Sequence, residues 1–212
     1  MQTPDSQGQP FPAQPRFPLA RLRADQELLK LHATRLPFNP FPALRQMGVN
    51  VLTYAEFARA CGLTIDVVTA FAGTEEGCLM MHHGRRCLLY NDAFTDCWEH
   101  IRWTVAHELG HDLLGHLRDH TTGEIAAASE EAYKILESEA DACAAELLAP
   151  KCILYALGAR DVEDIRRRCQ ISKQAAGKAA HFFTCVHGSY RLNAVEAQLC
   201  TRFHDFLHSG AA

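Results

Sequence analysis

The residues best suited to chemistry in this chain are two histidines four positions apart, with a glutamate directly after the first: His107, Glu108 and His111. Residues four apart in a helix project from nearly the same face, so two imidazoles at this spacing can reach one metal ion. Glu108 then lies beside the metal, where its carboxylate can take a proton from a metal-bound water. The spacing therefore predicts a catalytic zinc site with Glu108 as the general base.

The sequence around this motif predicts one long amphipathic helix. Apolar side chains recur there at every fourth position, at Ile101, Val105, Leu109 and Leu113. This period places His107 and His111 on the opposite side, so the helix would bury one face and turn the histidines toward a cleft. Gly110 costs a helix about 1 kcal/mol relative to alanine. That cost favours a second segment passing close to the helix at this point.

Two histidines and one water leave a tetrahedral zinc one protein ligand short. In the extended metzincin pattern a histidine ten positions after His107 supplies that ligand, but Leu117 stands there. His116 misses the position by one and, on a continuous helix, lies about 140° around from His111. We therefore expect His116 to be a cap or surface residue and the third ligand to come from elsewhere.

A second predicted helix, from Glu130 to Ala149 with Ser129 as its N-cap, offers acidic candidates. Glu137 and Asp141 are four apart and share a face, so Glu137 is the expected third ligand. Asp141 would accept a hydrogen bond from the other ring nitrogen of a ligand histidine and fix its orientation. Glu139 is the alternative ligand, about 200° around the helix from Glu137.

Three segments together resemble the ImmA/IrrE-type metallopeptidase family: RWTVAHELGH at 102–111, ESEAD at 137–141 and AELLAP at 145–150. The resemblance extends from about Leu36 to Phe183. The chain departs from the family pattern at Cys143, where an aromatic residue is usual, and at Trp103, where phenylalanine is common. Both are core positions, so the chemistry is expected to be intact.

The resemblance implies that His107, His111 and Glu137 bind zinc and that Glu108 is the base. Members of the family commonly cleave helix-turn-helix repressors in stress responses or mobile elements. The resemblance therefore implies a metalloendopeptidase acting on a protein substrate, with a separate transcriptional repressor as the leading candidate. The sequence leaves open whether zinc or manganese is the metal in the cell, and it leaves open the oligomeric state.

Composition limits the other classes of function. The 212 residues are 48% hydrophobic, enough to bury a sizeable core. The net charge of −4 provides no global positive field for nucleic acid or anionic lipid. No apolar run approaches the roughly 18 residues that span a bilayer, and the polar start differs from a signal peptide. We expect a cytoplasmic protein whose nine scattered cysteines are mostly reduced thiols.

The expected fold class is α+β, with a mainly helical zincin-like core and a small sheet or hairpin before the motif helix. We expect a disordered Pro/Gln-rich leader over 1–20, a metallopeptidase core over 21–155 and a C-terminal helical extension over 156–212. Within the core, a helix is expected from Asp25 to Leu36 and a first strand at 48–52. A hairpin is expected from strands at 79–81 and 87–90, and its edge strand would pair with an extended substrate.

The C-terminal extension contains a predicted helix-turn-helix, with helices at 161–169 and 172–183. Acidic neighbours offset its arginines and alanines form its packing face, so packing on the core or docking of a partner is favoured over direct nucleic-acid binding. Two alternative functions remain: a zinc-stabilised regulator that binds without cutting, and a DNA-binding factor acting through residues 161–183. Four residues are candidates for stabilising an oxyanion, namely Tyr133, Tyr155, His181 and Tyr190.

Overall fold

The computed structural model describes residues 11–95, 97–119, 125, 128–159, 161–186 and 190–209. These residues form a mainly helical α+β fold with one three-stranded sheet, which confirms the predicted fold class. The strands are β1 (Asn50–Thr53), β2 (Gly77–His82) and β3 (Arg85–Tyr90). The helices are α1 (Phe17–Lys30), α2 (Pro40–Gln46), α3 (Tyr54–Cys61), α4 (Ile65–Ala72), α5 (Trp98–Leu114), α6 (His116–Asp119), α8 (Glu130–Leu148), α9 (Lys151–Ala156), α10 (Val162–Cys169), α11 (Lys173–Val186), α12 (Ala194–Arg202) and α13 (His204–His208).

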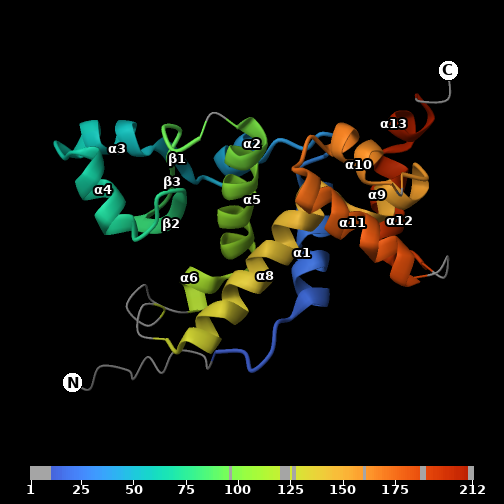
Figure 1. Ribbon diagram of the computed structural model, residues 1–212, viewed down its shortest axis with the longest axis horizontal. Helices are drawn as coiled ribbons and strands as arrows, with labels where there is room; N and C mark the ends of the chain where they lie inside the picture. The colour runs from blue at the N-terminus through green and yellow to red at the C-terminus, as the bar shows by residue number, and fades with distance from the viewer. Residues whose placement is uncertain are drawn as a thin grey trace.

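Two long helices, α5 and α8, cross at the centre of the molecule (Figure 1). The sheet with α3 and α4 lies on one side of them, and α9 to α13 lie on the other. At the crossing, a Cβ added to Gly110 would lie 2.9 Å from the backbone oxygen of Ala140 and 3.2 Å from Cβ of Cys143. The predicted close approach at Gly110 is therefore confirmed, and α8 is the segment that makes it.

One hydrophobic core joins the two central helices to the C-terminal helices. Val105 and Leu109 of α5 and Leu147 of α8 are fully buried in it. Ile165 of α10 and Phe203, which follows α12, are buried in the same cluster. The apolar stripe predicted for α5 therefore faces an interior that α8 shares, and the C-terminal helices cover part of it.

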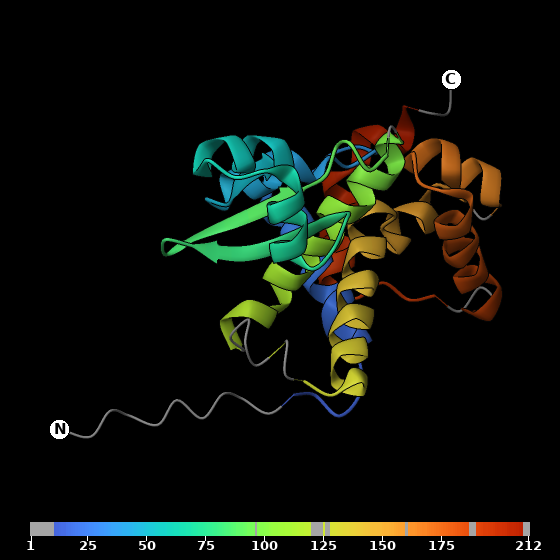
Figure 2. The ribbon, with the colours of Figure 1, turned by 60° about the vertical axis from the view of Figure 1, so that its left-hand side comes forward.

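The sheet has the strand order β1-β3-β2, with β1 parallel and β2 antiparallel to β3. The predicted hairpin is confirmed with a tighter turn, in which only His83 and Gly84 separate the strands and both have positive φ. Figure 2 shows the hairpin extending beside α5. Within the described sheet, β2 is an edge strand, as predicted.

The N-terminal helix differs from the prediction. It runs from Phe17 to Lys30, not from Asp25 to Leu36, because Pro18 in its first turn favours an earlier start and His32 leaves the helix with a φ of 54°. The last four residues of the expected disordered leader are therefore helical. Residues 1–10 of that leader lie outside the described residues.

Several helices were not predicted from the sequence, among them α3, α4 and α12. Each of these three begins at a side-chain cap that a motif search could have found. The capping boxes are Thr53 with Glu56 before α3 and Asn193 with Glu196 before α12, and Thr64 caps α4. Their short apolar patterns gave weaker evidence than these caps.

The predicted helix pair near 161–183 is present as α10 and α11, and Arg102 ties it to the core. The guanidinium of Arg102 is buried and donates to the carbonyls of Cys169 (3.1 Å), Gln170 (2.7 Å) and Phe38 (2.6 Å). The turn between the two helices is therefore held against α5. No helix in the described part of the chain is both long and apolar enough to cross a lipid bilayer.

Candidate metal centre

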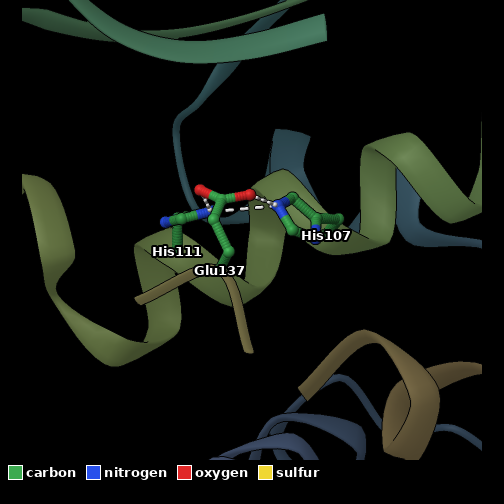
Figure 3. A group of neighbouring side chains, drawn as sticks. All are labelled: His107, His111 and Glu137. Carbon is green, nitrogen blue, oxygen red and sulfur yellow. Dashed lines mark hydrogen bonds and ion pairs between the residues drawn. The ribbon is translucent and has the colours of Figure 1, made fainter. Parts of the chain in front are cut away.

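The crossing of α5 and α8 brings His107, His111 and Glu137 together. The Nε2 atoms of the two histidines are 3.0 Å apart. The Glu137 carboxylate lies between them, with Oε2 3.2 Å from Nε2 of His107 and Oε1 3.4 Å from Nε2 of His111 (Figure 3). Among the described residues, this is the only group of three or more histidine, cysteine or acidic side chains with donor atoms close enough to hold one metal ion.

The donor atoms of this group fit zinc. Two imidazole nitrogens and a carboxylate oxygen are a donor set that zinc prefers in catalytic sites. Ligand atoms about 2.0–2.1 Å from a tetrahedral zinc are about 3.3 Å from one another. The separations of 3.0 to 3.4 Å among the three side chains are close to this value.

The charges around the site favour a cation there. Burial lowers the pKa of His107, but hydrogen bonds with Asp141 and Glu137 outweigh burial and raise this pKa to about 10. Burial raises the pKa of Glu137, but the two histidines outweigh it and hold that pKa well below its usual range. The lowered pKa keeps Glu137 ionised, so a negative carboxylate lies where the three side chains meet.

Asp141 lies on the outer side of this group. Its Oδ1 is 3.0 Å from Nδ1 of His107, the ring nitrogen that faces away from His111. The sequence placed Asp141 and Glu137 on one face of α8, and in the structure both contact His107. When the ring is neutral, an acceptor at Nδ1 leaves the lone pair of His107 on Nε2, toward Glu137.

A cleft of about 410 Å³ opens at this group, and Glu108 and Tyr133 line it. Burial raises the pKa of the Glu108 carboxyl, and the nearby histidines oppose this effect. Burial and the neighbouring Glu137 raise the pKa of Tyr133 to about 12, so its phenol stays protonated. The cleft therefore contains both a carboxylate and a phenolic donor beside the three clustered side chains.

The other three oxyanion candidates lie away from this cleft. Tyr155 and Tyr190 pack against each other, with ring centroids 5.2 Å apart. His181 is on α11, where its Nε2 is 3.5 Å from Sγ of Cys185. Sequence spacing did not choose among the four candidates, and the tertiary structure brings Tyr133 to the cleft.

The edge strand β2 forms one wall of the cleft. Gly77, Cys78 and Leu79 line the cleft together with residues of α5. A Cβ added to Gly77 would lie 2.8 Å from Cγ2 of Thr104, so the start of β2 lies directly against the helix. The backbone of an edge strand is therefore placed beside the clustered histidines.

Glu139, the alternative ligand, lies outside the cleft and is fully buried. Its carboxylate accepts hydrogen bonds from Arg16 and contacts His116. The prediction for His116 is wrong, because this side chain is only 2% exposed. The helix ends at Leu114, and Gly115, with a φ of 77°, turns the chain so that His116 folds back onto His111. An angle calculated for a continuous helix therefore does not apply to His116.

Comparison with protein-family models matches residues 65–181 to the IrrE N-terminal-like domain, a peptidase family. The matched segment is more than half of the chain and includes α5, α8 and the three clustered side chains. No curated protein matches the chain in sequence. The chain belongs to the IrrE N-terminal-like family of peptidases.

Proposed function

We propose that this protein is a zinc-dependent metalloendopeptidase that hydrolyses a peptide bond in another protein. The observation that supports this function best is the convergence of two Nε2 atoms and one carboxylate in a cleft that also contains Glu108. The leading substrate class is a helix-turn-helix transcriptional repressor, which comes from the family resemblance. A cytoplasmic location is part of the same proposal.

His107, His111 and Glu137 would hold the zinc ion. When bound, zinc supplies a Lewis acid that makes water more acidic and polarises the carbonyl of the bond to be cut. Asp141 accepts the Nδ1 proton of His107, and this bond keeps Nε2 directed at the site. The motif of α5 and the acidic pair of α8 therefore act together as one site.

Glu108 is the proposed general base. Its carboxylate takes a proton from the attacking water and later delivers that proton to the leaving amine. Burial raises the pKa of Glu108, so its carboxylate is a stronger base than an exposed glutamate. Tyr133 is the proposed donor to the oxyanion, because its protonated phenol lines the same cleft.

An extended substrate segment would pair with β2. The backbone of an edge strand can form main-chain hydrogen bonds with a peptide laid beside it. This arrangement requires the target to expose an unfolded or extended stretch at the cleavage site. A linker between the domains of a repressor meets that requirement, whereas a folded helix does not.

The metal content of the purified protein tests the site. We expect about one zinc per chain by mass spectrometry in the wild type, and loss of zinc in His107→Ala and Glu137→Ala. Glu139→Ala should retain zinc at saturating concentration, because Glu139 lies outside the cleft. Absence of stoichiometric metal from the wild type would refute the proposed function, and loss of zinc only in Glu139→Ala would refute Glu137 as the ligand.

A second experiment separates cutting from binding. Candidate repressors are incubated with the wild type, with Glu108→Gln, and with Glu130→Gln as a control at an exposed position of α8. We expect cleavage by the wild type and the control, and binding without cleavage by Glu108→Gln. If the wild type, Glu108→Gln and Glu130→Gln all change repressor function equally and without cleavage, the protein is a regulator that only binds. DNA affinity that falls steeply with salt would identify a DNA-binding factor.

A further inference from the structure

A buried series of polar side chains runs from His111 to the segment before α1. Nδ1 of His111 is 2.8 Å from Nδ1 of His116, and Nε2 of His116 is 3.1 Å from Oε2 of Glu139. Glu139 also accepts from the backbone N–H of Arg16 (2.6 Å) and from its guanidinium through Nε and Nη2 (both 2.8 Å). His116 is 2% exposed and Glu139 is 0% exposed, so water does not compete for the bond between them.

The partners of Glu139 determine where the proton of His116 lies. A carboxylate that receives three N–H groups from Arg16 is an ionised acceptor, so His116 must donate to it from Nε2. A neutral His116 with its proton on Nε2 has a lone pair on Nδ1. That lone pair faces Nδ1 of His111, which must therefore donate.

The same reasoning determines the tautomer of His111. With its proton on Nδ1, His111 has its lone pair on Nε2, and this atom lies 3.0 Å from Nε2 of His107 and 3.4 Å from Oε1 of Glu137. A neutral imidazole with its lone pair on that nitrogen is the form that binds a metal ion there. His116 therefore favours the tautomer that the candidate site needs.

We propose that His116 is a positioning residue of the metal site, which acts through His111 and is itself oriented by Glu139 and Arg16. The inference rests on the proposed function insofar as it takes His111 to be a ligand. Asp141 is half exposed and orients His107 directly. The orientation of His111 depends instead on the series of His116, Glu139 and Arg16, which we call the relay. The relay joins three separate parts of the chain: the residue before α1, the start of α6 and the middle of α8.

Zinc affinity tests the relay without any substrate. The dissociation constant is measured by competition with a chelator, and the melting temperature of the zinc-free protein is measured in parallel. Loss of a side chain that orients a metal ligand typically weakens metal binding about 10- to 100-fold. We expect a loss of this size in His116→Phe. His116→Asn should retain most of the affinity, because its Oδ1 can accept the Nδ1 proton of His111.

Two further variants separate positioning from a general effect on folding. Arg16→Gln weakens only the outer end of the relay, so it should reduce zinc affinity less than His116→Phe does. Glu146→Gln is the matched control, because Glu146 is 1% exposed, lies two turns further along α8 and pairs with Lys151. We expect this control to lower the melting temperature and to leave zinc affinity unchanged.

A spectroscopic measurement adds a direct test of the tautomers. In long-range ¹H–¹⁵N spectra of the zinc-free protein, the neutral ring of His116 should carry its proton on Nε2. Wild-type zinc affinity in His116→Phe, or a proton on Nδ1 of His116, would overturn the proposal. An equal loss of affinity in His116→Asn and His116→Phe would also overturn it. If the wild type binds no zinc, the proposed function itself fails, which is a different result from normal binding in every variant.

Should His116→Phe fail to fold, Arg16→Gln and His116→Asn still decide the question. Wild-type affinity in Arg16→Gln, or a proton on Nδ1 of His116, would then reject the relay. Weaker binding in Arg16→Gln, with the melting temperature of the zinc-free protein close to that of the wild type, would support it.

Discussion

Replacing Gly110 by alanine tests the contact that sets the crossing of α5 and α8. The new Cβ would lie 2.9 Å from the backbone oxygen of Ala140 and 3.2 Å from its Cα. Carbon–oxygen contacts of this type are normally about 3.3–3.6 Å, so one helix must move. Because the closest atoms belong to the backbone, a side-chain rotation cannot relieve the overlap.

The expected cost of Gly110→Ala follows from two opposing effects. Overpacking of a well-packed contact costs about 1–3 kcal/mol, whereas alanine is favoured over glycine within a helix by about 1 kcal/mol. The difference is a net destabilisation of about 0–2 kcal/mol. The 2.9 Å approach to a backbone oxygen favours the upper half of this range. A shift of α8 would also move Glu137 relative to the two histidines, so zinc affinity should fall as well.

Gly177→Ala is the matched control for this prediction. Gly177 lies within α11, and a Cβ added there meets nothing within 4 Å. This change should therefore stabilise the protein by up to about 1 kcal/mol, the helix-propensity effect alone. Both variants are measured by urea unfolding monitored by circular dichroism. The reasoning fails if Gly110→Ala is at least as stable as the wild type, because the crossing would then tolerate a Cβ.

Three further predictions concern other parts of the molecule. Arg102→Met should leave three backbone carbonyls, two of them in buried hydrogen bonds, without their donor and reduce the free energy of unfolding by about 1–3 kcal/mol, measured in urea; an unchanged value would contradict the role of Arg102. Tyr133→Phe should lower kcat about 10²–10³-fold and leave zinc content unchanged, and normal kcat would exclude the phenol as oxyanion donor. Burial, with a contribution from Glu146, raises the pKa of Asp25 to about 8, above an unfolded value of about 3.9. The folded state therefore holds an extra proton between about pH 4 and 8, and stability should fall as pH rises through this window. Asp25→Asn should flatten that dependence in pH-dependent melting curves, and an unchanged slope would contradict this assignment.

Features that depend on local spacing could be predicted from the sequence. The helical period places His107 with His111 and Glu137 with Asp141, because residues four apart share a face whatever the rest of the fold does. Ser129 and Pro150 bound α8 for a similarly local reason, since caps and helix-breaking residues act on their own turn. The fold class and the hairpin before α5 also follow from patterns within short windows.

Features that depend on contacts between distant segments required the tertiary structure. Glu139 and Glu137 are two residues apart on one helix, yet Glu139 binds Arg16, which lies 123 positions earlier in the chain. No periodic pattern encodes such a pairing, because it arises when α1 packs against α8. The same holds for Tyr133, which only the folded cleft distinguishes from the other oxyanion candidates.

The sequence by itself determined which side chains can bind a metal and on which helical faces they lie, because backbone geometry and residue type suffice for that. The tertiary structure decided how α5 and α8 cross, which places Glu137 between the two histidines. It also decided the position of His116, because one left-handed residue, Gly115, turns the chain out of the helix and back onto His111. A change of direction at a single residue moves every side chain after it, so helical periodicity does not predict where side chains point beyond that residue.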